Sequence, residues 1–233
     1  MFDAIGYERD VSDGTQRVET ALAIVMGDPT EGIPLLRIHS QCFTGEVLGS
    51  LRCDCHDQLE MAMQAVAEEG RGLVIYEYQE GRGIGLMAKL EAYELQDAGL
   101  DTVEANHALG FKADCRDFSM PAAILSDLGI ERVRLLSNNP HKARALVENG
   151  IELVVQLACE AVPNPHSLAY LRTKKERMGH ALTLGLCEST DQTRDLRAVR
   201  LRRTARDVFG LDSGDHNRTV DVAPRARGIE AQL

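Results

Sequence analysis

Apolar and polar positions alternate along the chain in segments whose lengths fit strands and helices. Residues 21–26 form an apolar run that predicts a buried strand, and residues 34–39 predict a second strand. Residues 59–69 place apolar side chains at helical spacing and end before Gly70, which predicts a helix closed by a glycine. The first part of the chain therefore follows a strand-and-helix pattern.

The same pattern continues to about residue 155. An apolar strand predicted at 72–76 leads through a glycine-rich turn into a helix predicted at 86–98, which ends at Gly99. Two further helix-to-strand steps follow, namely 122–128 with 133–136 and 142–149 with 151–155. Such alternation predicts a layered α/β domain whose functional sites lie in the loops beyond the strand ends.

The two ends of the chain differ from this central part. Residues 1–20 are polar and weakly patterned, and from Arg194 onward the chain is rich in Arg, Asp and Gly with few large apolar residues. We therefore predict one domain over 1–184 and a polar, Arg-rich, mobile tail over 185–233. The alternative is a basic helix that docks on the acidic body or on a partner, formed by Arg194, Arg197, Arg200, Arg202, Arg203 and Arg206.

Composition and charge narrow the class of protein. At 233 residues, 44% of them hydrophobic, the chain can form one sizeable core without disulfides. Its net charge of −10 argues against a nucleic-acid partner, because affinity for DNA or RNA depends on Lys and Arg neutralising phosphates. A small molecule that carries phosphate is still compatible, provided that local Arg, Lys or bound Mg²⁺ offsets the overall charge.

The cysteines and the N-terminus bear on cellular location. The six cysteines are unevenly spaced, and no charged segment followed by an apolar run opens the chain. These features predict the reducing cytoplasm rather than a disulfide-linked secreted fold. No apolar run approaches the roughly 20 residues that span a bilayer, so we expect a soluble protein with no membrane partner.

Three cysteines, Cys42, Cys53 and Cys55, have the spacing of a zinc site. Thiolates are soft ligands that suit Zn²⁺, and three protein ligands would leave the fourth tetrahedral position for water, as in a catalytic site. A fourth ligand would make the site structural, and His39, His56 or Cys115 is a candidate for it. Catalytic zinc, structural zinc and merely buried, reduced cysteines are all open on spacing alone.

A glycine-rich turn at 78–85 lies between an apolar strand and a helix. There, glycines allow backbone N–H groups to approach an anion at the helix N-terminus, so the turn suggests a phosphate site. Arg82 strengthens this interpretation because a guanidinium can bind phosphate through two hydrogen bonds. A purely structural turn is the alternative.

Three other places carry polar side chains of interest. Residues 114–118 offer a carboxylate base and an arginine, although charged loops are usually solvated. After an apolar strand, Asn139 is predicted to cap a helix that starts at Pro140, and the flanking Ser137 and Lys142 could face a nucleotide. Tyr93 lies on a predicted helix, where spacing alone indicates ordinary packing.

Six segments of the chain match one family in order. They are RIHSQCFTGE (37–46), SLRCDC (50–55), QEGRGIGL (79–86), LQD (95–97), DTVEAN (101–106) and LSNNPHK (136–142). Together they closely resemble the GTP cyclohydrolase II family, and the resemblance extends from about residue 23 to residue 180.

The resemblance implies an enzyme that opens the imidazole ring of GTP. Formate would leave from C8 and pyrophosphate from the triphosphate, with 2,5-diamino-6-ribosylamino-4(3H)-pyrimidinone 5′-phosphate as the other product. Cys42, Cys53 and Cys55 would bind one Zn²⁺ per subunit, which favours the catalytic over the structural interpretation. We accordingly expect a homodimer with a three-layer α/β sandwich, in which helices flank a mixed sheet.

The resemblance also assigns roles to single residues. Asp114 and Arg116 match a proton acceptor and a nucleophile or phosphate-handling group, and Tyr93 matches the tyrosine needed for ring opening. Since a guanidinium stays protonated, we expect Arg116 chiefly to stabilise charge at the α-phosphate. Mg²⁺ would accompany the triphosphate. The implied GTP contacts are Arg37, Ile38, His39, Ser40, Gln41, Gln58, Glu80, Gly81, Arg82, Thr102, Ser137 and Lys142.

Three positions depart from the family pattern. His56 stands where Gly is usual, Gln41 where Glu is usual and Ser137 where Thr is usual. The resemblance implies the entry step of riboflavin biosynthesis, and these departures suggest a divergent paralogue that serves a secondary-metabolite pathway starting from the same pyrimidine. Two other hypotheses are a partial GTP hydrolase that retains the formyl group, and a non-catalytic nucleotide-binding protein in which His56 closes a structural zinc site.

Overall fold

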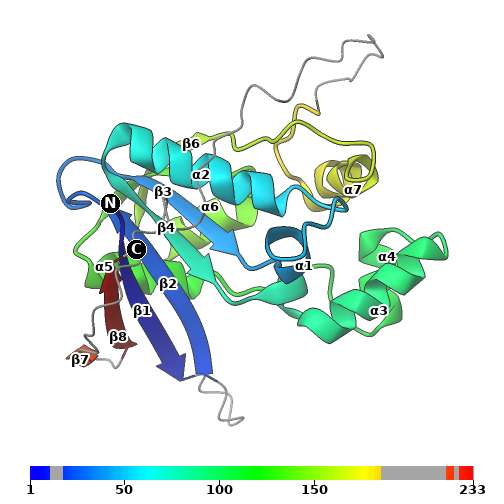
Figure 1. The fold of residues 1–233 in the computed structure, drawn as a ribbon, viewed down its shortest axis with the longest axis horizontal. Coiled ribbons are helices and arrows are strands. Elements are labelled where there is room, and N and C mark those ends of the chain that lie inside the picture. The colour runs from blue at the N-terminus through cyan, green and yellow to red at the C-terminus, as the bar shows by residue number, and fades with distance from the viewer. Residues whose placement is uncertain (11–17, 185–218, 223–225, 233) are drawn as a thin grey trace.

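The computed structural model describes residues 1–10 and 18–184, together with the backbone of 219–222 and 226–232. Its strands form one sheet in the order β6-β5-β3-β4-β2-β1-β8-β7 (Figure 1). Pairing is parallel from β6 to β4 and antiparallel from β4 to β7, so the predicted mixed sheet is confirmed. The strands are β1 (Asp3–Asp10), β2 (Val18–Met26), β3 (Leu35–Ser40), β4 (Gly72–Glu77), β5 (Arg132–Leu136), β6 (Glu152–Leu157), β7 (Thr219–Val222) and β8 (Ala226–Gln232).

Helices cover both faces of this sheet, as the sequence predicts. Successive side chains of a strand point to opposite faces, and β3 shows the consequence, because Leu35 packs in one apolar cluster and Leu36 in another. Helix α2 contributes to the first cluster, and α5 and α6 contribute to the second (Figure 1). The helices are α1 (Phe43–Glu46), α2 (Cys55–Glu69), α3 (Leu86–Asp97), α4 (Thr102–Ala108), α5 (Ser119–Asp127), α6 (Pro140–Glu148) and α7 (Leu168–Met178).

The predicted elements are present with bounds shifted by a few residues, and several further elements were not predicted. The side chain of Asn139 accepts a hydrogen bond from the His141 N–H and Pro140 starts α6, which confirms that helix start. The missed elements are polar or short. They are β1 in the weakly patterned N-terminal segment, the short helices α1 and α4, and the polar helix α7.

The C-terminal region is described only in part. The backbone of β8 pairs with β1 in antiparallel register, and β7 pairs with β8, which the sequence pattern did not predict. The arginine cluster between Arg194 and Arg206 lies outside the described residues. Within the part of the chain that is described, no helix has the length and apolar character needed to cross a membrane.

The carboxyl ends of the parallel strands set the position of the site. Chain segments that leave β3, β4 and β5 meet at this edge of the sheet, as expected for parallel strands. The segment after β3 is tied to the end of β4 by the Gln41 N–H, which donates to the Glu77 carbonyl at 2.8 Å. The turn after β4 is tied to the loop 114–118 by the Cys115 N–H, which donates to the Arg82 carbonyl at 3.0 Å.

Candidate active site

Three cysteines converge at this edge of the sheet. Cys42 follows β3, whereas Cys53 and Cys55 lie where the chain enters α2. The Sγ atoms of Cys42 and Cys53 are 3.6 Å apart, and all three Sγ atoms lie within 4.8 Å of one another. Within the described residues no other group of three His, Cys, Asp or Glu side chains meets this spacing. The sulfurs are therefore close enough together to hold one ion.

The space around the sulfurs fits a metal ion. Zinc–sulfur bonds of about 2.3 Å at tetrahedral angles put the sulfurs about 3.8 Å apart, close to the observed spacing. Gly45 keeps this space open, since a Cβ there would lie 2.9 Å from the Cys53 Sγ and 3.2 Å from the Cys42 Sγ. Thiolate sulfur is also the donor type that suits Zn²⁺. The residues present thus fit zinc.

The residues considered as a fourth ligand point elsewhere. His39 is buried and its Nε2 lies 2.9 Å from Glu46 Oε1. His56 is more than half exposed, and its Nε2 lies 3.5 Å from Glu60 Oε1. Cys115 is also exposed, on the loop 114–118. Within the described residues the cluster therefore offers three protein sulfurs to an ion, and three protein ligands is the number typical of catalytic zinc sites.

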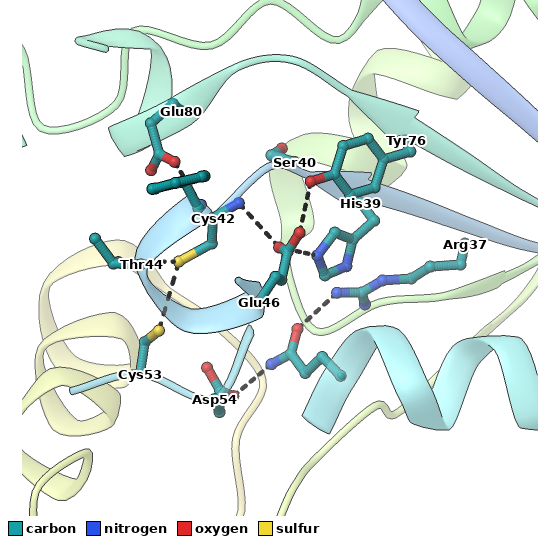
Figure 2. A network of polar contacts seen from close by, with 12 residues as sticks. Arg37, His39, Ser40, Cys42, Thr44, Glu46, Cys53, Asp54, Tyr76 and Glu80 are labelled. Atoms are coloured by element: carbon teal, nitrogen blue, oxygen red, sulfur yellow. Dashed lines mark hydrogen bonds and ion pairs between the residues drawn. The ribbon is translucent and has the colours of Figure 1, made fainter. Parts of the chain in front are cut away.

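The buried carboxylate of Glu46 holds the backbone of Cys42 in place. Oε1 of Glu46 accepts a hydrogen bond from the Cys42 N–H at 2.9 Å and also contacts His39, and Oε2 accepts one from the Tyr76 hydroxyl at 2.5 Å (Figure 2). Burial lowers the pKa of His39 to about 4 despite the neighbouring Glu46, so this imidazole is neutral at pH 7. A neutral ring with its proton on Nε2 donates to Glu46, which fixes the backbone that carries Cys42.

Glu80 supports the same segment from the other side. Its Oε2 accepts a hydrogen bond from the Phe43 N–H at 2.6 Å, and its Oε1 accepts from the Lys89 ammonium at 2.7 Å. The carboxylate is buried by these contacts. Glu80, predicted as a GTP contact, thus also positions the start of α1.

Lys89 places a positive charge beside the sulfur cluster. Its Nζ lies 3.2 Å from the Cys42 Sγ, and its side chain is only 12% exposed. The pKa of Cys42 is well below its usual range because the Cys53 and Cys55 thiols donate to its sulfur and Lys89 lies next to it. Sequence reasoning missed Lys89, since a lysine on a predicted helix is usually solvated.

Two adjoining cavities make up the site. The first contains the three cysteines with Gln41, Arg52, Tyr93 and Thr102. The second is rich in cations and contains Arg37, Gln58, Ser137, Lys142, Lys174 and His180. Both are lined by Ser40, Cys55, Arg82, Arg116 and Tyr170, so one continuous cleft joins the sulfurs to the cations.

The glycine-rich turn presents Arg82 to this cleft. Gly81 and Arg82 both have φ near +60°, which is ordinary for glycine and uncommon for arginine. The guanidinium lies over the Tyr170 ring, 5.4 Å from its centroid, and its Nη1 and Nη2 are buried with no hydrogen-bond partner among the described residues. A buried cation with unused donors requires an explanation, and an anionic ligand supplies one.

Arg116 and Asp114 form a close pair on the neighbouring loop. The guanidinium donates to both carboxylate oxygens, at 2.9 and 2.5 Å, and reaches the Ser40 hydroxyl at 3.3 Å. Burial alone would raise the pKa of Asp114, but Arg116 holds it below its usual value. Arg116 lines both cavities, whereas Asp114 lines neither and contacts Arg116 on the side away from them.

Tyr93 lies on α3 beside the sulfur cluster. Its hydroxyl is 3.3 Å from the Thr44 hydroxyl, and the Arg52 guanidinium lies 4.9 Å from the ring centroid. Burial raises the pKa of Tyr93, so its phenol is protonated at neutral pH. The structure therefore brings Tyr93 into the first cavity, which helical spacing alone could not indicate.

The remaining predicted contacts divide between the cleft and the core. Lys142 is buried, donates to the Ile38 carbonyl at 2.9 Å and has a pKa lowered by burial. Gln58 accepts a hydrogen bond from Arg37 at 2.6 Å, which orients that guanidinium. Ile38 itself packs in the hydrophobic core, so its side chain lies away from the cleft.

The fold and the site together define a layered α/β protein whose cleft is lined by arginines and by a cluster of three cysteines that could hold a metal ion. The model of the GTP cyclohydrolase II family matches residues 1–158, and the chain belongs to this family.

Curated relatives agree with this assignment. The chain is 49% identical over 184 residues to GTP cyclohydrolase-2 of Hahella chejuensis, covering 78% of this chain and 86% of the relative. It is 50% identical over 182 residues to GTP cyclohydrolase-2 of Shigella boydii, covering 78% and 90%. It also matches riboflavin biosynthesis protein RibBA of Phocaeicola vulgatus at 49% identity over 175 residues, but spans only 42% of that longer protein.

Proposed function

We propose that this chain is a zinc-dependent GTP cyclohydrolase II. It converts GTP to 2,5-diamino-6-ribosylamino-4(3H)-pyrimidinone 5′-phosphate, formate and pyrophosphate, a step that serves riboflavin biosynthesis. The observation that carries the proposal is the single cleft lined by both the cysteine cluster and the unpaired Arg82 guanidinium. The names of relatives about 50% identical support it.

The first cavity suits the guanine end of the nucleotide. Zn²⁺ held by Cys42, Cys53 and Cys55 would act there as a Lewis acid that lowers the pKa of water at its fourth position. The protonated Tyr93 phenol, which lines the same cavity, supplies a proton during ring opening. Gln41 and Thr102 also line this cavity, where their side chains can hydrogen-bond the base.

The second cavity suits the triphosphate. Arg37 adds a cation to those of Arg82 and Arg116, and together they offset the overall negative charge of the protein, while the Lys142 amine lies in the same cavity as a further donor. Arg116, held by Asp114, stabilises charge at the α-phosphate, and Asp114 is the proton acceptor that the family resemblance assigns. Mg²⁺ enters with the triphosphate, and the active protein is a homodimer.

Product analysis tests the proposal. The purified protein is incubated with GTP and Mg²⁺, and formate and pyrophosphate are measured. Both products support the proposal, pyrophosphate without formate indicates the formyl-retaining hydrolase, and neither indicates a non-catalytic nucleotide-binding protein. Full activity in a Cys53→Ser variant would contradict the proposed role of zinc. Formate release at the normal rate in a Tyr93→Phe variant would contradict the proposed role of Tyr93.

A further inference from the structure

Helix α7 borders the cleft although it lies beyond the residues matched by the family model. Tyr170 lines both cavities and Lys174 lines the second. The Lys174 ammonium also lies 4.4 Å from the centroid of the Tyr170 ring, on whose face Arg82 packs. The chemistry proposed above uses neither residue, so their positions need another explanation.

Lys174 forms a buried ion pair with the residue between two of the cysteines. Its Nζ lies 3.0 Å from Asp54 Oδ1, and the two residues are 8% and 4% exposed. The Gln58 amide donates to the other Asp54 oxygen at 2.5 Å, and the Gln58 carbonyl oxygen in turn accepts from Arg37. Burying two charges is costly unless both are paired and hydrogen-bonded, and here they are.

The orientation of Asp54 shows that this pair overrides a common local preference. Asp54 occupies the N-cap of α2, where a carboxylate normally accepts a hydrogen bond from the N–H groups of the first turn. Its side chain makes no such bond and turns to Lys174 and Gln58 instead. The helix α2 therefore lacks a side-chain cap, and the Asp54 carboxylate instead connects the segment from Cys53 to Cys55 with α7.

We infer that Lys174 is a positioning residue for the metal site, acting through Asp54 to hold Cys53 and Cys55 at the spacing that an ion needs. The inference rests on the zinc binding proposed above. Thiolates crowded together repel one another, so the backbone must be held before the ion binds. Contacts one shell beyond the ligands typically change metal affinity about 10–100-fold.

The matched control lies next to Lys174 on the same helix. Lys175 is exposed and its Nζ donates to the Thr183 carbonyl at 3.4 Å, away from the cysteines. Lys174→Met and Lys175→Met each remove one ammonium from α7. Only Lys174→Met also removes a contact to Asp54. Asp54→Asn tests the other partner with almost no change in size.

The test measures metal binding and not only turnover. Zinc affinity is measured by competition with a chromophoric chelator, the visible spectrum is recorded after loading with Co²⁺, and unfolding by urea is followed for the metal-free proteins. We expect Lys174→Met and Asp54→Asn to weaken zinc binding about 10–100-fold and to shift the Co²⁺ bands. Lys175→Met should match the unsubstituted chain in both measurements.

The outcomes separate this inference from the proposed function. A folded Lys174→Met protein with unchanged zinc affinity and Co²⁺ spectrum overturns the inference, even if the protein is less stable, since the pair would then serve the fold alone. If Lys174→Met does not fold, Asp54→Asn decides in the same way. If the unsubstituted chain binds neither metal, the zinc proposal itself fails, and the inference fails with it.

Discussion

Gly45 matters because it has no side chain. Any Cβ at this position would approach two of the three sulfurs more closely than van der Waals contact allows. Spacing identified Cys42, Cys53 and Cys55 from the sequence, because three thiols within 14 residues suit one ion. It could not identify Gly45, whose role depends on the path of the chain through α1.

Gly45→Ala should therefore impair metal binding without unfolding the protein. The added methyl group would lie 2.9 Å from the Cys53 Sγ, so the sulfurs must separate. We expect zinc affinity to fall at least about tenfold in chelator competition. Gly49→Ala is the control for zinc affinity, because nothing lies within 4 Å of its Cβ position, although its φ of +67° costs about 1–2 kcal/mol of backbone strain. Equal zinc affinity in both variants would contradict the assignment.

His39 makes the stability of the fold depend on pH. Its pKa falls from 6.5 in the unfolded chain to about 4 in the folded protein because the ring is buried. Between these values the unfolded chain binds more protons, so stability decreases as the pH is lowered through this window. We expect the free energy of unfolding to drop by about 2 kcal/mol from pH 7 to pH 5 on this account.

Urea unfolding at several pH values, with chelator present throughout, measures this effect. His39→Gln should make the dependence between pH 7 and 5 less steep, while His180, whose pKa burial lowers to about 3, still contributes to it. His166→Gln, which removes an exposed histidine, should leave the slope unchanged. A His39→Gln protein with the original slope would assign the pH dependence to other groups.

At the scale of elements, the apolar pattern predicted the helices and strands that place several side chains in the hydrophobic core. Elements β3, β4, β5 and α2 were found this way, since their apolar residues reach the two core clusters. Helix α7 escaped because it is polar and one of its buried positions is a lysine, whose partner Asp54 lies 120 residues away. A buried ion pair between distant segments leaves no periodic signal in the sequence.

The turn between β4 and α3 shows a similar limit. Its glycines indicated an anion site. Only the structure shows that the guanidinium nitrogens of Arg82 are buried there without hydrogen-bond partners among the described residues. Such an unpaired cation lowers stability while it favours a ligand, because buried donors without acceptors cost about 1–3 kcal/mol. Removing the Arg82 guanidinium should therefore raise the stability of the fold and weaken the binding of substrate.

Arg82→Met tests this opposition, since methionine keeps much of the packing on Tyr170 but has no N–H donor. We expect the free energy of unfolding to stay the same or rise by about 1 kcal/mol, and the KM for GTP to rise at least about tenfold. Arg132→Met is the control, because Arg132 forms an exposed ion pair with Glu152 on the neighbouring strand. A strongly destabilised Arg82→Met protein with normal KM would make Arg82 structural.

At the scale of the whole molecule, the site and the core lie in the same stretch of chain. The two hydrophobic clusters draw on residues between Phe2 and Cys159, and the cleft draws on residues between Arg37 and His180. The chain just beyond the cleft is still anchored, since the Ala181 N–H donates to the Asn138 carbonyl at 3.0 Å. The division of the chain at residue 184 stays a prediction.

A protein that ends at residue 184 should fold, bind zinc and release formate from GTP at close to the rate of the full chain. In the described residues, β8 contacts the sheet through three register pairs with β1, from Asp3 with Gln232 to Ile5 with Glu230, so we expect its removal to cost no more than about 3 kcal/mol. The exposed edge of β1 could then pair with another copy, and size-exclusion chromatography at several concentrations would reveal this. Loss of zinc binding in a folded, monodisperse truncated protein would show that residues 185–233 contribute to the site, and the two-part division of the chain would have to be abandoned.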